Sequence, residues 1–180
     1  MTLRSPGWLR SLVYYSRIRH LSWKPEMEIE KLLAEIKSGT SLARQHAAMQ
    51  LGKSGNKQAV PALLEALADD DSSARSNAVY SLAELDAREA ISRIVARLRE
   101  DDNGFVRKSA AKALGLMKAT VAVSALREAI NDDFAIVRKN AIRSLGQIGG
   151  AEAKKALEEA VNHRDLGVTE AARQALDALR

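Results

Sequence analysis

The chain has 180 residues, no cysteine and a formal net charge of +5. This length allows one domain with a substantial core, while the lack of cysteine excludes disulfides and thiolate chemistry and fits a reducing compartment. Aromatic residues make up only 4% of the chain against 46% hydrophobic residues. Alanine and leucine must therefore supply the packing, which favours closely approaching helices over a β-sandwich or barrel. No apolar run approaches the ~18 residues that a membrane-spanning helix needs.

Residues 1–25 form a basic, aromatic arm. Five basic residues and no acidic one precede Glu26, whereas the rest of the chain balances 23 Lys and Arg against 23 Asp and Glu. Tryptophan, tyrosine and arginine often anchor interfaces, so one interpretation is a docking peptide for a second protein or a membrane-bound complex. A helix capping the rest of the chain and a cleaved, arginine-rich targeting peptide are the other two. The docking residues would be Trp8, Leu12, Tyr14, Tyr15, Arg17, Ile18, Arg19 and Trp23.

A short pattern recurs every 31 or 32 residues after the arm: an arginine, an alanine three residues later and a leucine four residues after that. Self-similarity at this period predicts a stack of helical units, in which each unit buries its apolar face only against its neighbours. The copies are Arg44/Ala47/Leu51, Arg75/Ala78/Leu82, Arg107/Ala110/Leu114, Arg138/Ala141/Leu145 and, without the arginine, Thr169/Ala172/Leu176.

Each unit is predicted to contain two antiparallel helices. The first helix carries apolar residues at i, i+3, i+4 and i+7, as Ile29, Leu32, Leu33 and Ile36 do, which is one stripe of an amphipathic helix. The predicted second helices cover 43–51, 74–85, 106–117, 137–148 and 168–179. The repeat domain, 26–180, then divides into units at 26–57, 58–86, 87–118, 119–150 and 151–180.

Two features lie at the ends of the second helices. Acidic residues at 69–71, 101–102 and 132–133 precede three of these helices, and a carboxylate there is predicted to cap the free amides of the first turn. Gly52, Gly115 and Gly146 each follow the repeated leucine. They suit either a close helix contact or a left-handed helix end, and the sequence leaves both open.

The pattern Asp-Asp, then Val-Arg-x-x-Ala-x-x-x-Leu-Gly, resembles the HEAT-repeat superfamily, in particular the alanine-rich bacterial type found in phycocyanobilin-lyase subunits. It is clearest at Asp101, Asp102, Val106 to Ala110 and Leu114 to Gly115, and the resemblance covers 26–180. It implies an all-α fold, an α-solenoid of about five helical hairpins preceded by the N-terminal helix or arm. It also implies an arginine–aspartate ladder between units, in which His163 and Thr169 occupy the ladder positions of a terminal cap. The ladder residues are Arg44, Arg75, Arg107 and Arg138 with Asp69, Asp101 and Asp132.

In this family the second helices line the concave surface. The first and fifth residues after the ladder arginine share one helix face, and in units three and four they are all cations. The resemblance therefore implies a basic groove for an acidic partner, although lysine is also a common residue on helix surfaces. The predicted groove residues are Lys108, Lys112, Lys139 and Arg143, beside Tyr80, Met49 and His46.

The function favoured by these features is a non-catalytic adaptor or assembly factor, in the cytoplasm or at the periphery of a membrane, with organellar targeting left open. We expect no cofactor, because the three histidines have no metal-ligand spacing and no nucleophile–base pair stands out. The alternative that the resemblance implies is a chromophore-handling subunit, a bilin lyase of photosynthetic antennae, in which a bilin would be bound. Nucleic-acid binding is the least favoured reading, because the repeat domain is neutral.

Overall fold

The computed structural model describes residues 25–179. These residues contain ten α-helices, four short 3-10 helices and no strand. The predicted docking residues of the arm, Trp8 to Trp23, lie outside the described residues. The α-helices are α2 (Pro25–Ser38), α3 (Ser41–Lys53), α4 (Val60–Ala66), α5 (Ser72–Glu84), α6 (Ile91–Glu100), α7 (Gly104–Leu116), α8 (Val123–Glu128), α9 (Ala135–Ile148), α10 (Gly150–Ala160) and α11 (Leu166–Asp177). The 3-10 helices are η1 (Lys57–Ala59), η2 (Arg88–Ala90), η3 (Thr120–Ala122) and η4 (Ala129–Asn131).

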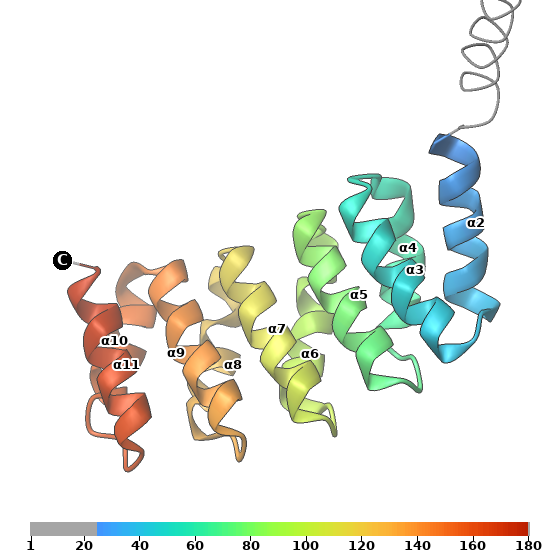
Figure 1. Cartoon of the computed structure of the whole chain (residues 1–180). Coiled ribbons are helices and arrows are strands. Elements are labelled where there is room, and N and C mark those ends of the chain that lie inside the picture. The colour runs from blue at the N-terminus through green and yellow to red at the C-terminus, as the bar shows by residue number, and fades with distance from the viewer. Residues whose placement is uncertain (1–24, 180) are drawn as a thin grey trace, which may run out of the picture.

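The helices pair into five hairpins that stack in a row, which is an α-solenoid (Figure 1). We call α3, α5, α7, α9 and α11 the second helices, and the surface that they form the second-helix face. They make one layer of the stack, and α2, α4, α6, α8 and α10 make the other. The second helices contact one another more extensively than the first helices do, so the stack is tighter on their side. The all-α solenoid predicted from the repeat is confirmed.

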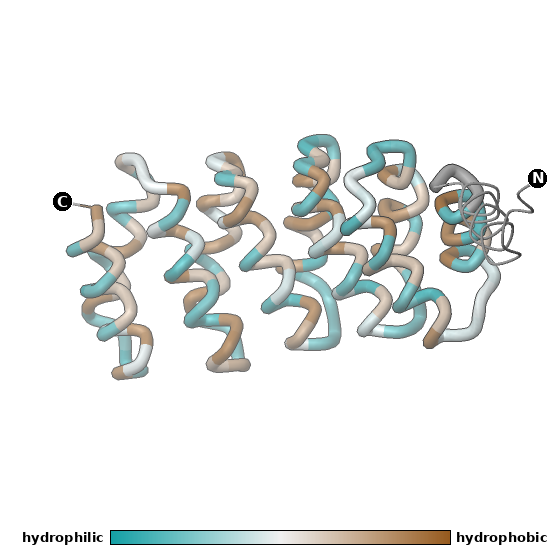
Figure 2. Tube along the Cα trace, turned by 45° about the horizontal axis from the view of Figure 1, so that its top comes forward, coloured by the Kyte–Doolittle hydropathy of each residue, from teal (hydrophilic) through white to brown (hydrophobic). Residues whose placement is uncertain are grey.

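The core lies between the two layers and between successive hairpins. The repeated alanines, Ala47, Ala78, Ala110, Ala141 and Ala172, are all completely buried. Hydrophobic and hydrophilic residues alternate along the helices in Figure 2, as expected where only one face of each helix is covered. None of the described helices is long and apolar enough to cross a bilayer. Because no hairpin can cover its own apolar stripe, the stability of the fold comes from stacking.

The structure decides the role of two of the repeated glycines. Gly52 and Gly115 lie inside α3 and α7, and a Cβ atom at either position would overlap the side chain of Ser81 or Ser144 on the next second helix. They are therefore sites of close helix approach. The left-handed residues come later, after the helices have ended, and Gly149, with a φ of +67°, is one of them.

The predicted capping by the acidic segments is correct for only part of the chain. Asp71 accepts hydrogen bonds from the amides of Ser73 and Ala74, as the prediction requires. Asn103 caps α7, and Phe134, at the start of α9, makes no side-chain cap. The aspartates at 69, 101 and 132 are not caps, because each lies two residues before the N-cap position of its helix. Their carboxylates bind arginines of the preceding hairpin instead.

Candidate partner-binding face

Arginines near the start of the second helices link neighbouring hairpins. Nε of each arginine donates to an aspartate in the next hairpin, while Nη1 donates to a backbone carbonyl between the helices of its own hairpin. The pairs, with their Nε to Oδ2 distances, are Arg44–Asp69 at 2.6 Å, Arg75–Asp101 at 2.9 Å, Arg107–Asp132 at 2.7 Å and Arg138–Asp165 at 2.9 Å. We call these four pairs the ladder.

The last rung differs from the sequence prediction, which placed His163 at the ladder position. His163 takes over the other task of the ladder aspartates, because its Nδ1 accepts the amide of Asp165 at 2.9 Å, as the Asp132 carboxylate accepts the amide of Phe134 at 2.8 Å. Asp165 then binds Arg138 and also caps α11 by accepting the amide of Gly167. A search for any carboxylate 25 to 27 residues after each arginine would have found it.

The ladder is largely buried, and its carboxylates are held in the ionised form. The Asp101 side chain is completely buried and that of Arg75 is 10% exposed. The hydrogen bond from Arg44 lowers the pKa of Asp69. Burial raises the pKa of Asp101, but the hydrogen bonds from Arg75 and from the amide of Asn103 outweigh it and keep the pKa below its ordinary value. The guanidinium groups of these arginines are already bound to aspartates, so the cations available to bind another molecule are others on this face.

Two such cations surround an aromatic ring on the second-helix face. The ammonium groups of Lys108 and Lys112, on α7, lie 6.0 Å and 5.3 Å from the ring centre of Tyr80, on α5. Lys108 is also 5.8 Å from the ring of Phe105. Cations at these distances are attracted to the negative face of the ring. The tyrosine and the two lysines, which the sequence predicted to lie on one face, therefore form a single cluster.

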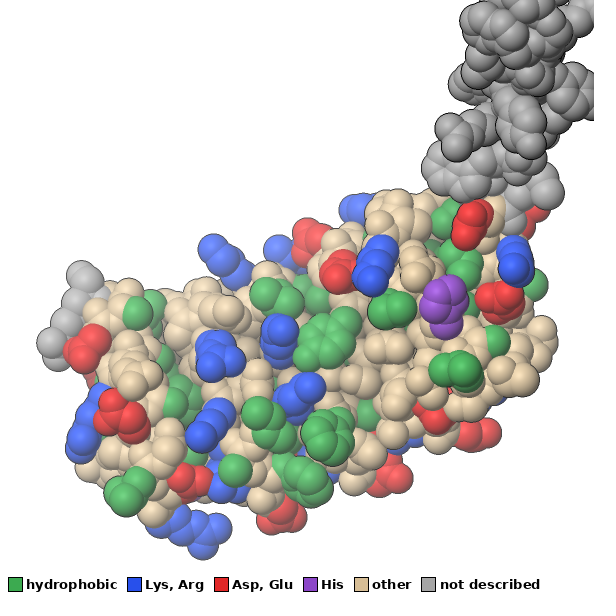
Figure 3. All heavy atoms as spheres, in the orientation of Figure 1, with side chains coloured by type: hydrophobic (Ala, Val, Ile, Leu, Met, Phe, Trp, Pro, Cys, Tyr) green, Lys and Arg blue, Asp and Glu red, His purple; other side chains and the backbone are tan. Residues whose placement is uncertain are grey.

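The other two predicted cations, Lys139 and Arg143, are exposed on the next second helix, α9. We call Lys108, Lys112, Lys139 and Arg143 the cation row. Figure 3 shows Lys and Arg side chains gathered beside hydrophobic ones over the middle of this face. Among residues 25–179, no member of the cation row makes an ion pair.

His46 and Met49 lie on α3, two helices along the stack from α7. His46 is exposed, and its Nε2 lies 3.2 Å from Nε2 of Gln50 on the same helix. Met49 is half-buried. These two residues therefore lie at the N-terminal end of the second-helix face, apart from the cation row on α7 and α9. The described residues contain no group of three or more His, Cys, Asp or Glu that could hold a metal ion.

Sequence reasoning missed a groove between α9 and α11. The groove has a volume of about 560 Å³, with Lys139 and Arg143 on the α9 side and Glu170 on the α11 side. Its apolar part is formed by Ile142, Gly146, Ala171, Ala175 and Ala178. The signal in the sequence was the series of alanines on α11, which are too small to fill the space beside α9. The repeated pattern of apolar residues did not distinguish them from alanines of ordinary helix packing.

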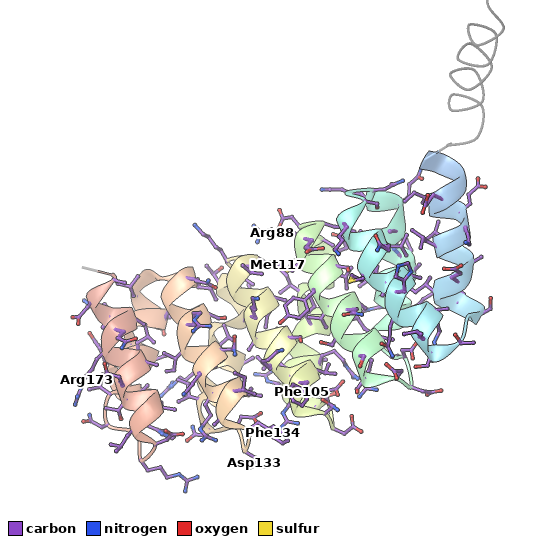
Figure 4. The ribbon with its side chains drawn as sticks, viewed as in Figure 1. Arg88, Phe105, Met117, Asp133, Phe134 and Arg173 are labelled. Atoms are coloured by element: carbon purple, nitrogen blue, oxygen red, sulfur yellow. The ribbon has the colours of Figure 1, made fainter. Side chains whose placement is uncertain are left out.

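Exposed aromatic residues at the start of α7 and α9 were also missed. Phe105 and Phe134 are 62% and 46% exposed, and Figure 4 shows them close together at the same end of their helices. The guanidinium of Arg107 lies 5.4 Å from the ring centre of Phe134. That ring packs on Gly104, where a Cβ atom would come within 2.6 Å of it. The two exposed phenylalanines thus lie next to Lys108 and extend the cluster around Tyr80.

Comparisons with known proteins agree with this architecture. A chain in the complex of CpcE and CpcF of phycocyanin lyase from Nostoc sp. PCC7120 is similar in structure, with a TM-score of 0.71 and 26% identity; the match covers 84% of this chain and 64%, just under two thirds, of that one. A designed armadillo repeat protein, solved in complex with the peptide (KR)4, shares the fold with a TM-score of 0.63 and 21% identity, over 83% of this chain and 80% of that one. A search of curated proteins gave no match. The family model for HEAT repeats matches residues 29–115 and 94–177, and the chain belongs to the HEAT-repeat family.

Proposed function

We propose that this protein is a non-catalytic adaptor or assembly factor that binds an acidic region of a partner protein with its second-helix face. The observation that carries the proposal is the cation row, four basic side chains without an ion-pair partner among residues 25–179. A row of like charges in a repeat domain that is neutral overall creates a local positive potential, which steers and orients an acidic partner.

Several other basic side chains in the described part of the chain are neutralised by a carboxylate of the next hairpin. On the first helices, Arg99 binds Glu128 at 2.8 Å and Arg127 binds Glu159 at 2.6 Å, so each is neutralised by the next hairpin. On the second-helix face the ladder arginines are neutralised in the same way. Other described cations, such as Arg93 on α6 and Arg173 on α11, also make no ion pair, but the cation row places four such side chains on two neighbouring second helices. This clustering of unpaired cations on adjacent helices supports a binding role for the row beyond ordinary surface solubility.

The aromatic residues beside the row strengthen the proposal. Tyr80 is half-buried beneath two lysines, and Phe105 is exposed next to one of them. Tyrosine, with an apolar ring and a polar hydroxyl, is enriched at the energetic centres of protein interfaces. We further propose that the arm of residues 1–25 docks a second protein or a membrane-bound complex, as its tryptophans, tyrosines and arginines favour.

The proposal is tested by reversing the charge of the cation row. The variant carries Glu at all four positions, and a control variant carries Glu at four exposed cations outside the second helices: Lys57, Arg93, Lys118 and Lys155. Both variants and the wild type are used to capture proteins from a native lysate at low and at physiological salt. We expect the cation-row variant to lose a captured protein that the control retains, and salt to weaken that capture. Equal capture by both variants would rule out the row as the binding surface.

A second candidate function is supported by the likeness to the CpcE–CpcF structure. In this reading the chain is a subunit that handles a bilin chromophore or its acceptor protein, and the second-helix face holds the pigment or the acceptor. Mixing the protein with a free bilin and recording the visible absorption band tests it. A shifted band that the cation-row variant lacks would favour this function over the adaptor.

A further inference from the structure

The second helices pack tightly where a serine of one helix meets a glycine of the helix before it. Ser81 and Ser144 each donate a hydrogen bond of 2.8 Å to a backbone carbonyl of the preceding second helix. Each lies directly against a glycine, Gly52 or Gly115, and both glycines are buried. At these two interfaces, α3 with α5 and α7 with α9, the serine closes the space between the helices.

The last interface, between α9 and α11, lacks this closure. Ala175 stands where α5 and α9 carry the serine, and it has no hydroxyl group to reach the preceding helix. The matching glycine, Gly146, is half-exposed, and a Cβ atom there would meet only Ala175, with a nearest approach of 3.2 Å. One turn earlier, Ala171 stands where α9 carries Asn140. Two alanines on the inner side of α11 therefore leave the groove of about 560 Å³ open.

The rim of this groove is charged in a specific way. Lys139 and Arg143 line its α9 side, and neither has an ion-pair partner within the described part of the chain. The Lys139 stem passes over Gly167, where a Cβ atom would come within 3.2 Å of Cε. On the opposite side, Glu170 accepts a hydrogen bond from Gln174 at 2.9 Å. An occupant must therefore combine an apolar group for the floor with a carboxylate for the two cations.

We propose that this groove receives an aliphatic side chain of an acidic protein segment, so that the partner's binding motif is an aliphatic residue flanked by carboxylates. This inference rests on the proposed function and adds the site that reads the partner's sequence. The groove opens onto the cation row, and Gln147 on its rim supplies both a donor and an acceptor for a peptide backbone. Charge complementarity selects the acidic segment, and the apolar floor selects the aliphatic residue.

The test uses two fluorescein-labelled peptides of twelve residues, rich in glutamate, that differ only in one central residue, Leu or Ser. Their dissociation constants with the full chain are measured by fluorescence anisotropy at low salt. We expect the Leu peptide to bind about tenfold more tightly, since a leucine partly buried in an open groove gains a fraction of its full burial energy.

Filling the groove should remove this preference. In the Ala171→Leu variant the new side chain occupies the apolar floor, so we expect the Leu peptide to bind as weakly as the Ser peptide, whose affinity stays unchanged. Ala151→Leu, which adds the same side chain at an exposed position of α10, should keep the wild-type preference. Circular dichroism and the melting temperature establish that both variants fold. The comparison of the two peptides on the wild type tests the preference for an aliphatic residue without any variant.

The outcomes separate the groove from the proposed function. If the wild type binds both peptides equally and the cation-row variant binds neither, the proposal of an acidic partner is supported. The proposal that the groove receives an aliphatic side chain is then wrong. If Ala171→Leu leaves the preference for Leu intact, the preference arises elsewhere on the face and the assignment to this groove is wrong. If the wild type binds neither peptide, the groove proposal and the acidic-partner proposal both fail.

Discussion

Replacing Arg75 with methionine removes the most buried rung of the ladder while keeping the aliphatic part of the side chain. Arg75 donates to the two carboxylate oxygens of Asp101 at 2.9 Å and 2.8 Å, and to Asp102 at 2.7 Å. Without it, the buried Asp101 carboxylate keeps the amide of Asn103 at 3.0 Å and Arg97 at 3.4 Å. The variant therefore leaves a charge in the interior that is only partly compensated.

The expected loss in the free energy of unfolding is about 3 kcal/mol. Removing one partner of a buried ion pair generally costs about 3–5 kcal/mol, because the other charge stays buried. We expect the lower end of that range, since Asp101 retains two of its hydrogen-bond donors. A loss of this size is a large share of the roughly 5–15 kcal/mol that stabilises a typical domain.

Urea unfolding followed by circular dichroism measures the loss, and the same substitution at Arg99 is the control. Arg99 also joins two hairpins, donating to both oxygens of Glu128 at 2.8 Å and 2.9 Å, but both side chains are exposed to solvent. Exposed pairs contribute little, so Arg99→Met should unfold close to the wild-type midpoint. Equal shifts for the two variants would refute the argument, because burial would then not be what makes the rung stabilising.

Two further predictions concern packing and pH. Gly115→Ala should destabilise by about 1–3 kcal/mol, because its Cβ overlaps Ser144. Gly146→Ala should melt at or above the wild-type temperature, since alanine favours a helix by about 1 kcal/mol and only the half-buried Ala175 lies nearby. Identical melting temperatures for the two variants would contradict the close contact at Gly115. In acid, the lowered pKa values of the ladder aspartates give stability that is complete above their unfolded pKa of about 3.9 and is lost as the pH falls through the folded values. The urea midpoint should therefore be flat from neutral pH to about pH 5 and fall below about pH 4, and a midpoint that does not fall in acid would refute the role of the ladder.

The repeat made most of the fold predictable from the sequence. The spacing of arginine, alanine and leucine placed the second helices within about two residues of their observed starts. This works because equivalent residues of successive units pack in equivalent environments. Helix periodicity also predicted that Lys108 and Lys112 share one face of their helix, as Lys139 and Arg143 do on the next. That the two helices present these faces on the same side of the stack was implied by the resemblance. Local rules were enough wherever one unit resembles the next.

What the sequence could not determine lies where the units differ and where side chains from two units meet. The resemblance implied the ladder of arginines and aspartates, but the pattern did not separate the ladder aspartates from the caps. The structure does so: Asp71 caps α5, whereas Asp69, two residues earlier, binds Arg44. The last rung moved from His163 to Asp165, two residues on. The groove lies where Gly146 faces Ala175, whereas Gly52 and Gly115 each face a serine. Each of these depends on distances between residues about 25 to 33 apart in the chain, which only the stacked structure fixes.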